Sequence, residues 1–237
     1  MNVLLKVESL GRTFSTRSAT VEVFKDVSFE LSPGEVLVIK GRSGEGKSTM
    51  LGILSGLDRQ TAGSVKFAGA SLETMTVSEL AELRAQKIGM IFQSFNLISS
   101  WTAVENVEAV LMHRGMNPQL RNEKAIAVLR ELGLGSRLDN YPAELSVGQQ
   151  QRVAVARTLV NDPLLILADE PTGDVDAETA REVVELLMPR VRSGSAALLV
   201  ATHGAFDTDY ADRVLVLKDG CLSPAEDNSA KSKEPGQ

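Results

Sequence analysis

Hydrophobic residues recur along the chain in short uninterrupted runs, each followed at once by polar residues. Three such runs are VLVIK at 36–40, LLILA at 164–168 and ALLVA at 197–201. Continuous apolar runs of this length are typical of strands that are covered on both faces, as in a parallel sheet. The segment at 177–191, AETAREVVELLMPRV, has the spacing of a crossover helix. The pattern predicts an α/β fold.

The two ends of the chain have a different pattern. LLKVESLGRTF at 4–14 and VEVFKDVSFEL at 21–31 alternate apolar and polar residues, which predicts antiparallel strands. VLVLKDG at 214–220 ends in an Asp-Gly turn, as in a closing hairpin. The last segment, 222–237, is polar and contains proline, so we expect it to be loose and flexible.

The middle of the chain, about 94–160, is predicted to be helical and to interrupt the α/β core. VENVEAVLMHR and EKAIAVLRELG each place four apolar residues on one helical face, and Gly133 would end the second helix. These faces consist of Val104, Val107, Val110 and Leu111, and of Ala125, Val128, Leu129 and Leu132.

Composition narrows the class of protein. The chain has 237 residues, 43% of them hydrophobic, enough for one large core or a core with a smaller subdomain. Its formal net charge of −6 gives no general basic face, so nucleic-acid binding is not indicated. Cys221 is the single cysteine, which excludes an internal disulfide and fits a reducing compartment. The sequence shows neither a signal peptide nor a run of roughly 20 apolar residues, so any span at a membrane would belong to another chain.

A phosphate-binding loop follows the first predicted buried strand. GRSGEGKST at 41–49 matches the pattern G-x-x-x-x-G-K-[ST], with a strand before it and a helix after it. That context argues against a mere glycine-rich turn with an exposed lysine. Backbone N–H groups would surround phosphate oxygens, Lys47 would reach the β- and γ-phosphates, and Ser48 would bind Mg²⁺. The predicted ATP-binding residues here are Gly41, Arg42, Ser43, Gly44, Glu45, Gly46, Lys47, Ser48 and Thr49.

Polar residues also follow the two later strands. Asp169 and Glu170 lie at the carboxyl edge of the predicted sheet, where open α/β sheets bind ligands. Taken alone, such a pair more often caps a helix. Beside a phosphate loop, we assign Asp169 to Mg²⁺ and Glu170 to the attacking water. His203 ends the next strand, where it would contact the γ-phosphate or hold Glu170 and the water in place.

Six sequence motifs follow one another in the order that is found in one protein family. Over about residues 3–221 the chain resembles the ATP-binding subunit of an ABC transporter. The motifs are the phosphate loop, the Q-loop glutamine Gln93 in MIFQSFN, the signature LSVGQ at 145–149, the Walker B run LLILADE, the D-loop GDVD at 173–176, and the switch histidine His203.

The resemblance implies a P-loop NTPase (RecA-like) core with an N-terminal antiparallel β subdomain and a helical subdomain inserted after the Q-loop. A single nucleotide-binding domain would span 1–221. Its α/β core would comprise 1–93 and 161–221, its helical subdomain 94–160, and 222–237 would form the tail.

In this family the signature of one subunit closes over the ATP on the phosphate loop of another, head to tail. The hydroxyl of Ser146, the N–H of Gly148 and a helix beginning near Gln149 would face the γ-phosphate. We interpret Gln150 and Gln151 as solvated first-turn residues. The commonest family form is LSGGQ, so Val147 requires a backbone that a β-branched residue tolerates.

The remaining site residues follow from the same resemblance. Gln93 would contact the metal or the water when the helical subdomain swings inward. Phe14 would stack on adenine, the alternatives being that it is a core residue or that Phe24 stacks instead. The implied catalytic residues are Lys47, Gln93, Glu170 and His203, and the implied Mg²⁺ ligands are Ser48, Gln93 and Asp169.

The sequences of 81–107 and of ADEPTGDVD at 168–176 are similar to those of one branch of the family, the lipoprotein-releasing, macrolide-exporting and cell-division ATPases (LolD-, MacB- and FtsE-like). The branch implies an ATP-dependent homodimer, peripheral at the cytoplasmic face of the inner membrane, that drives a separate integral membrane permease subunit with an extracytoplasmic domain. Four apolar residues after Gln93 would dock that subunit or be buried: Phe95, Leu97, Ile98 and Trp101.

Three function classes follow. The first is a transport ATPase for export or extraction of an amphiphilic substrate such as a lipoprotein, lipid or drug-like molecule. The second is a cell-division type ATPase that regulates an extracytoplasmic enzyme. The third, a soluble ATPase acting on DNA or ribosomes, usually has two nucleotide domains or a long coiled coil, which this chain lacks. A small GTPase or a kinase is disfavoured because no N-K-x-D motif is present and LSVGQ has no role in either.

Overall fold

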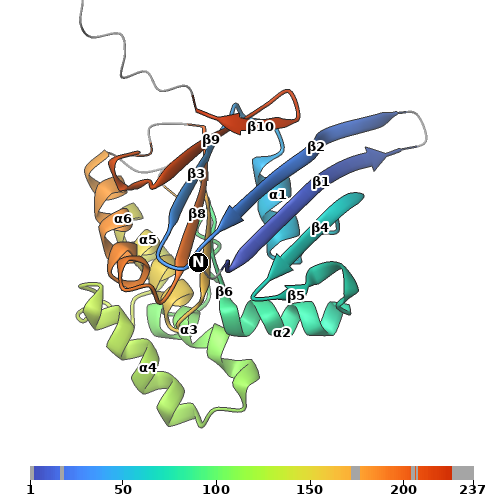
Figure 1. Ribbon diagram of the computed structural model, residues 1–237. Helices are drawn as coiled ribbons and strands as arrows, with labels where there is room; N and C mark the ends of the chain where they lie inside the picture. Colours follow the sequence, from blue (N-terminus) through green and yellow to red (C-terminus); the bar gives the residue numbers. More distant parts are fainter. Residues whose placement is uncertain (1–2, 17–18, 172–176, 204–205, 207, 226–237) are drawn as a thin grey trace, which may run out of the picture.

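Two β-sheets organise the chain in the computed structural model (Figure 1). The larger, in the described part of the chain, has six strands in the order β10-β9-β3-β8-β7-β6. All neighbours pair in parallel except β10, which is antiparallel to β9. Its strands are β3 (Val36–Lys40), β6 (Ile88–Ile91), β7 (Leu165–Asp169), β8 (Ala197–Thr202), β9 (Arg213–Lys218) and β10 (Cys221–Pro224). The structure describes residues 3–16, 19–171, 177–203, 206 and 208–225.

The central strands are covered on both faces, as their apolar runs predict. In β3, Val36 and Val38 belong to one buried cluster, whereas Leu37 and Ile39 belong to the other. Neighbouring side chains on a strand point to opposite faces. The sheet therefore separates two hydrophobic cores, and every residue of β8 is buried.

The first core lies between this sheet and the antiparallel N-terminal sheet. That sheet has the order β2-β1-β4-β5 and contains β1 (Leu5–Ser15), β2 (Thr20–Leu31), β4 (Ala62–Phe67) and β5 (Ala70–Ser71). The predicted strands at 4–14 and 21–31 are thus confirmed as an antiparallel pair. Helix α1 (Lys47–Leu54) buries Met50, Leu51 and Ile53 in this core. The connection onward to β6 contains η1 (Leu72–Thr74) and α2 (Val77–Lys87).

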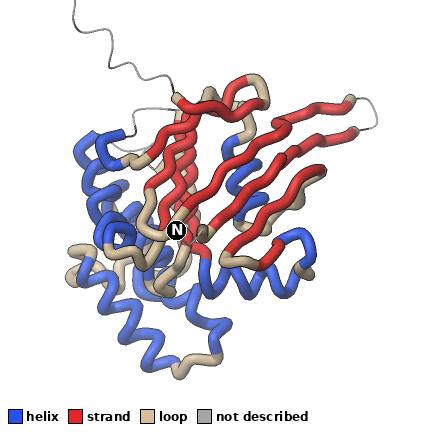
Figure 2. Tube along the Cα trace, viewed as in Figure 1, coloured by secondary structure: helices blue, strands red, loops and turns tan. Residues whose placement is uncertain are grey.

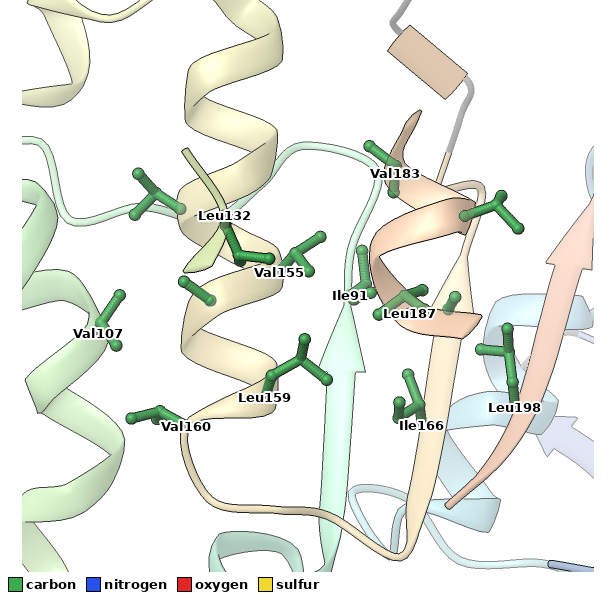
Figure 3. Close-up of a cluster of buried hydrophobic side chains, with 14 of the residues drawn as sticks. Ile91, Val107, Leu132, Val155, Leu159, Val160, Ile166, Val183, Leu187 and Leu198 are labelled. Carbon is green, nitrogen blue, oxygen red and sulfur yellow. The ribbon is translucent and has the colours of Figure 1, made fainter. Parts of the chain in front are cut away.

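Helices cover the opposite face of the six-stranded sheet (Figure 2). They are α3 (Ala103–Glu108), η2 (Ala109–Arg114), α4 (Pro118–Glu131), η3 (Pro142–Glu144), α5 (Val147–Leu159) and α6 (Ala177–Arg192), with η4 (Thr208–Tyr210) preceding β9. Helix α5 contacts α3, α4, α6 and β6. In Figure 3, Val155 and Leu159 of α5 lie on the side of the helix toward Ile91 and Leu187, and Val107 of α3 lies on the other side. The predicted helices of the middle segment therefore share one core with the sheet.

One boundary prediction is wrong. Residue 222 does not begin a loose tail, because Leu222, Ser223 and Pro224 pair with β9 and the N–H of Ala225 donates to Val214 O at 3.0 Å. The Asp-Gly turn at Asp219 and Gly220, both with positive φ, closes this hairpin. Residues 226–237 lie outside the described residues.

Within the described residues, no helix has the length and hydrophobicity that a bilayer crossing needs.

Candidate active site

The phosphate loop connects β3 to α1 and is held closely against the N-terminal sheet. Gly46, the residue before α1, has a φ of 96°, in the left-handed region that favours glycine. A Cβ at Gly46 would lie 2.3 Å from Cγ1 of Val23 on β2. Both the backbone conformation and the close approach therefore require glycine. Ser48 and Thr49 follow in the first turn of α1, where helix N–H groups attract anions.

Lys47 is buried, with 6% of its surface exposed. Its Nζ donates to the carbonyl oxygens of Gly41 at 2.8 Å and Arg42 at 3.1 Å. It also lies 3.5 Å from Oε1 of Glu170. The ammonium group is thus placed between the phosphate loop and the end of β7, where it can contact a phosphate bound by the loop.

Glu170 directly follows β7 and is held by two residues at the end of β8. Oε1 lies 2.7 Å from Nδ1 of His203, and Oε2 accepts a hydrogen bond of 3.0 Å from the hydroxyl of Thr202. Burial acts to raise the pKa of this carboxyl, but the hydrogen bonds from His203 and Thr202 outweigh burial and the pKa is lowered. Glu170 therefore remains ionised and able to accept a proton at neutral pH.

The backbone of Glu170 is strained. Its φ is 47°, a left-handed value that is uncommon for a residue other than glycine. Such conformations cost about 1–3 kcal/mol and persist only where surrounding contacts hold them. Here the N–H of Glu170 donates to Ala201 O at 2.8 Å, which anchors the residue to β8.

The environment of Asp169 raises the pKa of its carboxyl, whereas that of Glu170 is lowered. Its Oδ1 is buried and has no hydrogen-bond partner among the described residues. Burial raises the pKa of this carboxyl, while a hydrogen bond with Ser48 acts against that increase. A buried carboxylate oxygen without a partner beside a serine hydroxyl fits Mg²⁺, which takes oxygen ligands and typically few from the protein.

These elements border one cavity of about 540 Å³. It brings together residues from the phosphate loop, the Q-loop and the ends of β7 and β8. Its lining residues are Val23, Ser43, Gly44, Gly46, Lys47, Ser48, Thr49, Gln93, Glu170 and His203. The convergence predicted for these strand ends is therefore present. Thr202 was not predicted, although it stands immediately before His203 in ALLVATH.

Phe14 lies apart from this lining. The residue is 42% exposed, and the guanidinium of Arg12 lies over its ring at 4.2 Å from the ring centroid. The alternative that Phe14 is a core residue does not fit this exposure, and Phe24 is fully buried. Adenine stacking by Phe14 stays a prediction.

The signature forms the start of α5. Ser146 is the N-cap, and its hydroxyl accepts from the N–H of Gln149 at 3.3 Å in a capping box. The helix begins at Val147, two residues before the predicted start. Val147 has no positive φ and is 50% exposed, so the β-branched residue is tolerated as a first-turn residue. Ser146, Gly148 and Gln149 do not line the cavity of their own chain.

One assignment near the signature is wrong. Gln151 is not solvated: it is 1% exposed, and its Nε2 donates to the carbonyl of Pro171. Helical spacing does not predict this burial, because Gln151 lies one turn after the exposed Val147 on the same side of α5; the contact with Pro171 buries it. The D-loop GDVD at 173–176 lies outside the described residues.

Known proteins share this arrangement. A family model described as ABC transporter matches residues 24–173. The chain is 41% identical over 226 residues to an uncharacterized ABC transporter ATP-binding protein of Thermotoga maritima, covering 95% of this chain and 96% of that protein. It is also 41% identical over 220 residues to the macrolide export ATP-binding/permease protein MacB of Wolinella succinogenes, covering 93% of this chain. The chain spans only about a third of that relative, 34% of its length.

Solved structures agree with these matches. The dimeric, post-hydrolysis structure of the ATP-binding cassette MJ0796 bound to ADP and Pi aligns with a TM-score of 0.85 and 35% identity, covering 93% of this chain and 98% of that one. The α/β core with its antiparallel sheet and covering helices is thus a P-loop NTPase cassette. With the phosphate loop, Glu170 and His203 around one cavity, the chain belongs to the ABC transporter family and is an ATPase of that family.

Proposed function

We propose that the chain hydrolyses ATP as a head-to-tail homodimer and that closure of this dimer drives a separate membrane subunit. The main evidence for the dimer is that one chain holds the two halves of an ATP site apart from each other. Lys47, Glu170 and His203 line the cavity, whereas Ser146 and Val147 are exposed at the start of α5 and do not line it. A second copy would supply its exposed α5 N-terminus to the γ-phosphate, as the dimeric form of the related cassette supports.

Each residue would have a distinct role in hydrolysis. The phosphate-loop N–H groups and Lys47 bind the phosphates, and Glu170 accepts a proton from the attacking water. His203 holds the Glu170 carboxylate through the 2.7 Å contact. Ser48, Asp169 and Gln93 would hold Mg²⁺, which neutralises phosphate charge when it is bound. Donors from the partner's Ser146 and Gly148 strengthen binding of the γ-phosphate in the closed dimer.

Ser146→Ala tests the dimer. We expect ATP-driven dimerisation to weaken by about 10- to 150-fold, because a hydrogen bond to a charged group contributes roughly 1.5–3 kcal/mol. Binding of ATP by the monomer should not change, since Ser146 does not line the monomer's cavity. Analytical ultracentrifugation with ATP, in a Glu170→Gln background, measures the first quantity, and nucleotide titration at dilute protein measures the second.

Thr76→Ala is the matched control for the lost helix cap. Thr76 caps α2 with the same kind of capping box and does not line the cavity. Both substitutions remove a cap that contributes about 1 kcal/mol. Equal dimerisation by the Ser146 and Thr76 variants would contradict the role of the signature.

A groove beside the Q-loop supports docking of a membrane subunit. This cavity of about 500 Å³ is lined mainly by apolar residues of α2, β6, η2 and the segments on both sides of Gln93, including Met90, Phe92 and Ile98. Of the four residues predicted to dock, Ile98 is 42% exposed, and Phe95, Leu97 and Trp101 are half-buried. We propose that a helical segment of the membrane subunit packs against Ile98 and enters this groove.

The segment that carries Ile98 is fixed by the buried Asn106 and the half-buried Arg157. Oδ1 of Asn106 accepts from the N–H of Ile98 at 2.7 Å, and its Nδ2 donates to Ile98 O at 3.1 Å. Arg157 of α5 donates to the carbonyl oxygens of Phe95 and Asn96, both at 2.6 Å. A surface fixed in advance loses less conformational entropy when a partner binds. These contacts also join the groove to the helix that begins at the signature.

Ile98→Glu should reduce association with the membrane subunit at least about tenfold, because a buried apolar contact would be replaced by a desolvated charge. The measurement is the fraction of the chain that sediments with membranes of its source cells. Val77→Glu is the matched control, since Val77 is 77% exposed at the start of α2 and does not line the groove. Equal retention of both variants would argue against this docking surface.

Export or extraction of an amphiphilic substrate is the transport activity that we propose, supported by the macrolide-export relatives. Identification of the chain that co-purifies from membranes tests it. A permease whose loss stops efflux of such a substrate would support export. A partner whose outer domain activates an extracytoplasmic enzyme would instead support regulation of the cell-division type.

A further inference from the structure

The buried side chain of Gln151 contacts the segment that carries the catalytic carboxylate. Gln151 lies in the second turn of α5 and is 1% exposed. Its Nε2 donates to the carbonyl oxygen of Pro171, the residue directly after Glu170. A buried amide with this partner is costly to remove, because the carbonyl would be left without its donor in a site with little water.

The contact between Gln151 and Pro171 lies next to the strained backbone of Glu170. Glu170 has a left-handed φ of 47° and precedes a proline, whose neighbour normally prefers an extended backbone. On one side, the N–H of Glu170 is fixed by Ala201 O at 2.8 Å. On the other side, Pro171 has no N–H, so its carbonyl is the backbone group that can be held. Gln151 holds that carbonyl.

We propose that Gln151 is a positioning residue for Glu170. By fixing the Pro171 carbonyl it keeps the strained peptide in place, and the carboxylate stays between Lys47, Thr202 and His203. Without this hydrogen bond the backbone can relax towards the extended region and move the carboxylate away from the attacking water. The inference rests on the proposed role of Glu170 as the group that accepts the proton.

Gln151 also connects the catalytic segment to the helix that carries the signature. The same helix presents Ser146 at its N-cap and holds the carbonyls after the Q-loop through Arg157. One rigid helix thus joins the signature, the Q-loop and the hydrolytic carboxylate of a single chain. A displacement of α5 on dimer closure would therefore be transmitted to Glu170 through Gln151.

Gln151→Met tests the proposal, since methionine has a similar length and shape but no donor. We expect kcat for ATP hydrolysis to fall about 10- to 100-fold, the loss typical of a misplaced catalytic group. KM for ATP and the ATP-driven dimerisation measured in a Glu170→Gln background should stay unchanged. A residue that only stabilises the fold would lower dimerisation and nucleotide binding together with kcat.

Gln150→Met is the matched control. Gln150 is the adjacent residue of α5, and its Nε2 donates to Leu145 O at 3.1 Å rather than to the catalytic segment. It should hydrolyse ATP at the wild-type rate. Should Gln151→Met fold poorly, Gln151→Asn provides a second test, because it keeps the amide but is too short to reach Pro171. The same loss of kcat at unchanged KM is expected.

The outcomes separate this inference from the proposed function. Wild-type kcat in the folded Gln151 variants overturns the positioning role, as does a loss of dimerisation equal to the loss of kcat. If Glu170→Gln itself hydrolyses ATP at the wild-type rate, the proposed role of Glu170 fails instead, whatever Gln151 does. If Glu170→Gln is inactive and Gln151→Met is fully active, only the positioning role fails.

Discussion

Replacing Glu170 by Gln is expected to lower the steady-state rate of ATP hydrolysis by about 10²–10⁴-fold, the usual contribution of a positioned general base. Glutamine has nearly the same shape and can keep a hydrogen bond to Thr202, but it does not accept a proton. ATP binding should persist, because Lys47 and the phosphate loop are untouched. The ATP-bound dimer should therefore accumulate, which phosphate-release assays and size-exclusion chromatography with ATP would show together.

The lowered pKa of Glu170 also predicts the pH dependence of the wild-type chain. Because the folded-state pKa lies below that of an ordinary glutamate, the carboxylate is already ionised throughout the neutral range, so titration of Glu170 should not change the rate of ATP hydrolysis between pH 6 and 8. Glu131→Gln, an exposed change on α4, is the control and should leave hydrolysis unaltered. Rapid turnover by Glu170→Gln would remove Glu170 from the reaction.

Lys47→Ala is expected to weaken ATP binding itself, by about 10- to 150-fold. The estimate is the roughly 1.5–3 kcal/mol that a hydrogen bond to a charged group contributes. The loss is large because the ammonium is 6% exposed and already desolvated between the phosphate loop and Glu170. Isothermal titration of the monomer with ATP, ADP and AMP measures it.

The three nucleotides distinguish a phosphate contact from a general collapse of the loop. Lys47 is assigned to the β- and γ-phosphates, so affinity should fall for ATP and ADP and remain for AMP. Lys66→Ala provides the matched control, since Lys66 is an exposed lysine of β4 paired with Glu8. An equal loss of affinity for AMP would indicate that the loop no longer folds.

Local sequence was sufficient for much of the fold. Residues 36–39, 165–168 and 197–201 of the three apolar runs are buried in the structure, because uninterrupted apolar residues of a strand are covered from both sides. The phosphate loop is likewise a local feature, in which the spacing of glycines, Lys47 and Ser48 already specifies a strand, a turn and a helix. Strand ends of a parallel sheet meet at one edge, so Glu170 and His203 were expected to be near each other, and their contact of 2.7 Å confirms it.

Burial of single polar residues was not predictable in this way. Three consecutive glutamines read as solvated, yet α5 is packed by α3, α4, α6 and β6, and only one of its faces reaches solvent. Which glutamine enters the interior is set by the segment that it contacts, here the carbonyl of Pro171, and not by helical spacing, because Gln151 lies on the same side of α5 as the exposed Val147. The end of the chain was misjudged for a similar reason, because Leu222 gains its order from pairing with β9 rather than from its own composition.

The sequence by itself determined the class of fold, the phosphate loop and the identity of the groups that can bind or attack a phosphate, because these depend on residue type and spacing within a few turns or strands. Only the tertiary structure decided how Glu170 is held and strained, that Asp169 has an oxygen without a partner among the described residues, and that Gln151 reaches Pro171. The physical reason is that burial and hydrogen-bond partners are set by contacts between segments far apart in the chain, which no local pattern records.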